Sequence, residues 1–159
     1  MSKLTGASTW EEDLYEHLTS HEAAESAMLI EYRDAAATST SSAFRYLSGL
    51  ILEDEIRHHK VFRDLAAALK NDVELDPQAP VIPHIGAWGS DAATVLAITE
   101  TLLEREREDA KELKALTSEL KSLKRESLWP LLVKLMEIDT AKHIEILKFV
   151  RRHARQELG

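Results

Sequence analysis

Residues 52–58 read LEDEIRH, and residues 137–143, at an offset of 85 positions, read EIDTAKH. In the first stretch Glu55 and His58 are three residues apart, so on a helix both side chains lie on one face. The same offset relates further pairs in charge, ligand type or apolar character: Asp54 and Asp139, Arg57 and Lys142, His58 and His143, Val61 and Ile146, Phe62 and Leu147, Leu65 and Val150. This ordered recurrence predicts two similar helices, each aiming an acidic group and an imidazole the same way.

One position departs from the repeat. Where the first stretch has Glu55, the second has Thr140. A neutral hydroxyl is a weak metal ligand compared with a carboxylate. Two interpretations follow: Thr140 opens a position for a substrate, or it marks a site that has lost its metal.

The composition indicates one soluble domain of ordinary type. The chain has 159 residues, of which 44% are hydrophobic and 30% charged, and this suits a single globular domain. A net charge of −8 argues against nucleic acid and anionic membranes as main partners. The absence of Cys excludes disulfides and thiolate-bound metal. Neither a membrane span nor a secretory signal is evident, so we expect a cytoplasmic protein.

The spacing of Gly and Pro leaves four long segments that predict helices. We expect helices over about residues 9–38, 42–70, 90–120 and 127–157. Thr9 is the expected cap of the first, since residues 9–12 read TWEE and fit a capping box. Pro130 belongs in the first turn of the last. The apolar residues of the second predict its core: Phe44, Leu47, Leu50, Ile51, Ile56, Phe62, Leu65 and Leu69.

The segment between the second and third helices predicts the topology. Residues 73–89 contain three Pro and two Gly, which makes them extended. They can reach roughly 55 Å, whereas the second helix would be roughly 43 Å long. A crossover along the full bundle is therefore possible, as in a ferritin-like four-helix bundle. We expect one all-α domain over residues 1–159, with hairpins at about 10–70 and 91–158 joined by a crossover at 71–90.

With these features the chain resembles the ferritin-like di-iron carboxylate proteins, in particular rubrerythrin-like members, over about residues 10–158. That family has one Glu on each of two helices and Glu-x-x-His on each of the other two. The resemblance implies that Thr140 stands where the family has its second bridging Glu. It also implies that Asp54 and Asp139 orient the histidines of the opposite half, with Tyr32 in the outer shell. The metal ligands that it implies are Glu25, Glu55, His58, Glu106 and His143.

Several assignments stay open from the sequence. Glu22 shares a helix face with Glu25 and rivals it as a ligand. Glu106 lies in the charged run ERERE at 104–108, a pattern also typical of a solvated helix face. His21 and His17 precede Glu25 by four and eight residues, and they fit either extra ligands or partly exposed surface histidines.

The resemblance implies a protein that binds iron, with manganese or zinc as alternatives, because carboxylate oxygen and imidazole nitrogen suit these ions. Its activity would be oxidation of Fe(II) or reduction of peroxide, with dioxygen or peroxide as partner. Three carboxylates would leave two divalent ions with unbalanced buried charge, so one ion and two ions both remain possible. We expect a homodimer or a higher homo-oligomer. The alternative is a metal-free, degenerate ferritin-like bundle that serves as a structural or interaction module.

Overall fold

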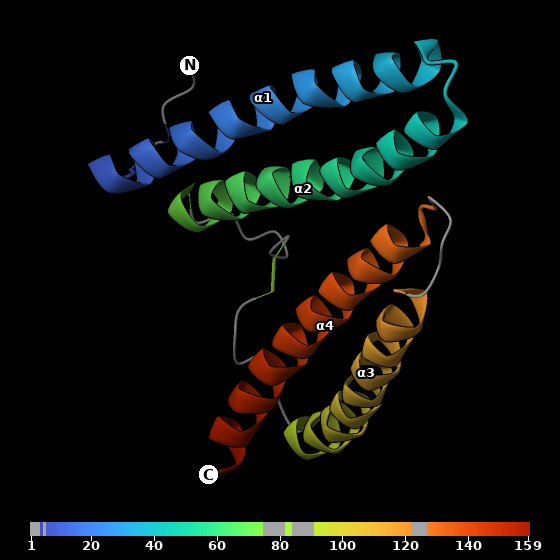
Figure 1. Ribbon diagram of the computed structural model, residues 1–159. Coiled ribbons are helices and arrows are strands. Elements are labelled where there is room, and N and C mark those ends of the chain that lie inside the picture. Colours follow the sequence, from blue (N-terminus) through green and yellow to red (C-terminus); the bar gives the residue numbers. More distant parts are fainter. Residues whose placement is uncertain (1–3, 5, 75–81, 84–90, 122–126) are drawn as a thin grey trace. The chain divides into compact units, whose positions relative to one another are not determined.

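The computed structural model describes residues 4, 6–74, 82–83, 91–121 and 127–159. These residues form four helices and no strand: α1 (Thr9–Thr38), α2 (Ser42–Glu74), α3 (Ala92–Leu120) and α4 (Trp129–Leu158) (Figure 1). The all-α prediction is confirmed, and every helix boundary lies within four residues of the predicted one. Most of the predicted crossover, at 71–90, lies outside the described residues.

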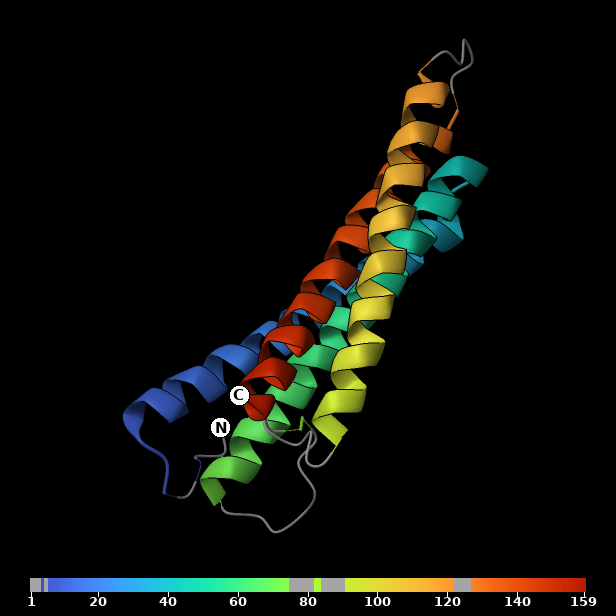
Figure 2. The same ribbon diagram turned by 90° about the horizontal axis from the view of Figure 1, so that it is seen from below.

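The helices form two hairpins. Helix α1 packs along α2, and α3 packs along α4 (Figures 1 and 2). The chain divides into two compact units at residues 1–84 and 85–159, so each unit contains one hairpin. Both predicted hairpins are therefore confirmed. We refer to α1 with α2 as the first hairpin and to α3 with α4 as the second hairpin.

The cap of α1 differs from the prediction by one residue. Ser8, not Thr9, is the N-cap: its backbone N–H donates to Glu11 Oε2 at 2.7 Å, and its hydroxyl accepts from the Glu11 N–H at 3.4 Å. Thr9 with Glu12 and Ser8 with Glu11 are overlapping capping-box motifs, and sequence alone does not rank them. The reciprocal pair that Ser8 forms with Glu11 fixes the start of α1.

Buried side chains in the described residues are few and partly polar. Leu103 on α3 is fully buried. The other buried apolar residues are Leu4, Leu18 and Ala66 in the first unit and Ala92, Leu113, Val133 and Ala154 in the second. Four polar residues are equally buried: Glu25, Ser48, Thr99 and Thr140. Because buried polar groups need partners, Glu25 and Thr140 are candidates for residues of a functional site.

Half of the residues predicted as the core of α2 are exposed. Phe44, Ile51 and Leu65 are 47%, 40% and 38% exposed, and Ile56 is exposed as well. Helix α2 buries one face against α1, whereas Phe44, Ile51 and Leu65 follow a seven-residue spacing along another face. His58 belongs to the same spacing. At the 85-residue offset the corresponding residues of α4 are Trp129, Met136, His143 and Val150.

Among the described residues, no helix has an apolar stretch long enough to span a bilayer.

Candidate metal centre

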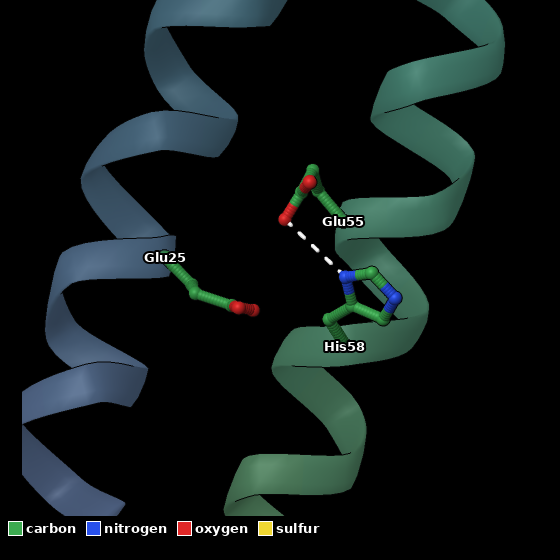
Figure 3. A group of neighbouring side chains, drawn as sticks. All are labelled: Glu25, Glu55 and His58. Carbon is green, nitrogen blue, oxygen red and sulfur yellow. Dashed lines mark ion pairs between the residues drawn. The ribbon is translucent and has the colours of Figure 1, made fainter.

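The first hairpin brings three of the predicted ligands together. Glu25 projects from α1 toward Glu55 and His58 on α2 (Figure 3). One ligand atom of each residue lies within 4.8 Å of the others. Among the described residues, this is the one set of three or more acidic or imidazole groups with such spacing.

Glu25 is the most unusual member of this group. The residue is 6% exposed, and its Oε2 atom is buried with no hydrogen-bond partner among the described residues. A buried carboxylate oxygen without a partner carries a free-energy cost. A cation at this position would remove that cost, because it would neutralise the charge and coordinate the oxygen.

Access to the group differs from residue to residue. The Glu55 side chain is 17% exposed, whereas the His58 side chain is 50% exposed. The group is therefore closed on the side of Glu25 and open on the side of His58. Water or a small molecule can reach it from the open side.

Two acid–imidazole contacts are longer than a hydrogen bond and close to the separation of two ligands on one ion. His58 Nδ1 lies 3.6 Å from Glu55 Oε2, and in the second hairpin His143 Nδ1 lies 3.4 Å from Glu106 Oε2. An N–H···O hydrogen bond spans roughly 2.7–3.2 Å. Two atoms that each lie about 2.1 Å from one ion, at a tetrahedral angle, are about 3.4 Å apart. Both pairs therefore have a separation that suits a shared ion.

The second hairpin has a different arrangement at the position equivalent to Glu55. Thr140 is 5% exposed, and its hydroxyl donates to Asp109 Oδ2 on α3 at 2.8 Å. Asp109 follows Glu106 by one helical turn and was not among the predicted site residues. Its spacing from Glu106 was a usable signal, because residues three apart share a helix face. Thr140 thus holds a carboxylate of the facing helix.

Glu22 and Glu25 contact different residues. Glu22 Oε1 lies 3.8 Å from His59 Nε2, and His59 Nδ1 lies 3.4 Å from the Ser26 hydroxyl. Glu22 is therefore associated with His59, whereas Glu25 lies beside Glu55 and His58. This geometry favours Glu25 over Glu22 as a ligand.

The predicted outer-shell acids are exposed and have partners on their own helices. Asp54 accepts from Arg57 at 2.6 Å, and Asp139 accepts from Lys142 at 2.5 Å. Their predicted role toward the histidine of the opposite half involves residues of different units and stays a prediction. Tyr32 is half-buried on α1, two turns beyond Glu25.

Comparison with known proteins gave no match among protein-family models, curated proteins or solved structures.

Proposed function

We propose that this chain is a ferritin-like metal-binding protein that holds iron or manganese, with zinc as an alternative, through Glu25, Glu55 and His58. The main observation in support of this proposal is the buried Oε2 atom of Glu25, which lacks a hydrogen-bond partner among the described residues. The donor set of two carboxylates and one imidazole is one that these divalent ions favour. Two carboxylates also balance the charge of one divalent ion, which limits the cost of burying it.

The chain's own residues define what the site could do. Glu25 is fixed by burial, Glu55 is nearly enclosed, and His58 borders solvent. Iron bound in such a set supplies electron transfer with dioxygen or peroxide. The activity we propose is accordingly oxidation of Fe(II) to Fe(III), with dioxygen or peroxide as the electron acceptor that is reduced and that enters beside His58.

The second hairpin supplies candidates for another ion. Glu106 and His143 have the separation expected of two ligands. Asp109 adds a carboxylate one turn from Glu106, although its Oδ2 already accepts from Thr140. The number of ions per chain, one or two, therefore tests whether Glu106 and His143 take part.

Metal analysis tests the proposal directly. The purified protein is stripped with chelator, reloaded with Fe(II) without oxygen or with Mn(II), and dialysed before elemental analysis. We expect at least about one ion per chain, because binding to a folded site survives dialysis. Glu25→Gln should abolish loading, whereas Glu16→Gln, at an exposed position of the same helix, should not. Negligible metal in the unaltered chain, or equal loading of both variants, would refute the proposal.

A further inference from the structure

His21 places an imidazole on the same helix as the buried acid, Glu25. It precedes Glu25 by one turn of α1, and its Nε2 atom lies 3.4 Å from Glu25 Oε1. The centroid of its ring lies 4.2 Å from that of the Phe62 ring on α2. The ring also stacks on His17, with 6.3 Å between the ring centroids. The His21 ring therefore lies beside Glu25 and in contact with α2.

The contact between His21 and Glu25 is longer than a hydrogen bond. At 3.4 Å it exceeds the usual N–H···O range of roughly 2.7–3.2 Å. It equals the separation of about 3.4 Å expected for two ligands of one tetrahedral ion. One oxygen of Glu25 thus lies at ligand spacing from an imidazole, while the other oxygen is buried without a partner.

We propose that His21 is a fourth ligand, so that the first hairpin alone forms a mononuclear site of Glu25, Glu55, His58 and His21. This inference rests on the proposed metal-binding function and narrows it to one ion. Two carboxylates and two neutral imidazoles balance one divalent cation, so no buried charge is left over. Such a mixed nitrogen and oxygen set suits Fe(II), Co(II) or Zn(II).

The site closes by a movement of His21. One ligand atom each of Glu25, Glu55 and His58 lies within 4.8 Å of the others, whereas His21 lies outside this group and contacts Glu25. The His21 side chain is 46% exposed, so its ring has room to turn toward the ion. On this arrangement, binding requires no residue of the second hairpin, and Thr140 has no effect on it.

Titration of the full chain with Co(II) tests the inference, because the visible spectrum of Co(II) reports its coordination number. The unaltered protein should bind about one Co(II) with the intense absorption of four-coordinate cobalt. His21→Ala should weaken binding by roughly 10–100-fold or more and give the weak spectrum of a six-coordinate ion. His17→Ala is the matched control, since His17 lies on the same face and stacks on His21, and it should bind like the unaltered chain. His21→Gln replaces His21→Ala if the latter loses helical circular dichroism.

Each other outcome has a definite meaning. If His21→Ala and His17→Ala bind alike while Glu25→Gln abolishes binding, His21 is no ligand and the proposed function stands. If Glu25→Gln also binds normally, both ideas fail. If Glu106→Gln combined with His143→Ala weakens Co(II) binding, the site is not confined to the first hairpin and the inference is overturned.

Discussion

The two hairpins differ in how the buried polar groups at and around equivalent positions are hydrogen-bonded. In the first, Glu55 faces Glu25, whose buried Oε2 has no hydrogen-bond partner among the described residues. In the second, Thr140 stands at the equivalent position and donates a hydrogen bond to Asp109. One hairpin therefore keeps a carboxylate oxygen without a hydrogen-bond partner in its interior, and the other satisfies its buried hydroxyl.

The two arrangements have opposite effects on the free energy of unfolding. A buried polar atom without a partner costs about 1–3 kcal/mol of folding free energy. A hydrogen bond such as that between Thr140 and Asp109 contributes roughly 1 kcal/mol in the opposite direction. Binding sites commonly retain destabilising groups that a ligand compensates. The comparison supports placing the proposed metal site in the first hairpin, and substitutions in the two hairpins test that proposal.

The largest expected effect is stabilisation by metal. At a free metal concentration of about 100 times Kd, the free energy of unfolding should rise by about 2.7 kcal/mol. Glu25→Gln should abolish the increase, whereas Glu106→Gln should retain it. Urea denaturation with metal and with chelator measures both. Equal losses in the two variants would mean that both hairpins bind the same ion, and the contrast between them would disappear.

The second effect is a gain of stability when the buried acid is removed. In chelator, Glu25→Leu should raise the free energy of unfolding by about 1–3 kcal/mol, because a carboxylate with an unsatisfied oxygen is replaced by an apolar side chain. Glu16→Leu, at an exposed position of α1, is the control and should change stability little. A loss of stability in Glu25→Leu would show that the apo protein satisfies this carboxylate in another way.

The third effect concerns the second hairpin. Thr140→Val should lower the free energy of unfolding by about 1 kcal/mol, since it removes the hydrogen bond to Asp109. Thr140→Ser keeps the hydroxyl and should retain the coupling to Asp109. A double-mutant cycle of Thr140→Val with Asp109→Ala should give a coupling of roughly 0.5–1.5 kcal/mol. Additive losses would mean that the hydrogen bond contributes nothing to stability.

The sequence predicts features that depend on period and repetition. Helix ends follow from caps and Pro, as at Thr38 and Pro130. The placement of Glu55 and His58 on one face follows from their three-residue spacing. The repeat then selected these two residues from the many acids and histidines of the chain.

The helical period does not predict which residues of the two helices meet across a hairpin. Asp109 meets Thr140, and His21 meets Phe62, because of the axial offset between neighbouring helices. A helical pattern shows which residues share a face, but it does not show which turn of the partner each one meets. For the same reason Phe44 and Ile51 fit a core pattern and are nevertheless exposed within their hairpin.

The smallest effect is a pH dependence that again differs between the hairpins. In the second, a hydrogen bond from Lys134, at 2.8 Å, and one from Thr117 on α3, at 2.6 Å, lower the pKa of Glu137 below its ordinary 4.5. In the first, the hydrogen bonds of Ser8 lower the pKa of Glu11 in the same way.

A carboxyl whose folded pKa is depressed stabilises the protein above its unfolded pKa, and this contribution is lost as pH falls through the folded pKa. Glu137→Gln should therefore destabilise the chain at pH 7, and the difference from the unaltered protein should disappear as the pH falls below the ordinary 4.5 and through the lowered pKa of Glu137. Since Glu137 joins α4 to α3 whereas Glu11 only caps α1, we expect amide hydrogen exchange to increase along α3 and α4 in Glu137→Gln. In Glu11→Gln the increase should be confined to the first turn of α1. A pH-independent difference for Glu137→Gln would assign its effect to packing rather than to ionisation.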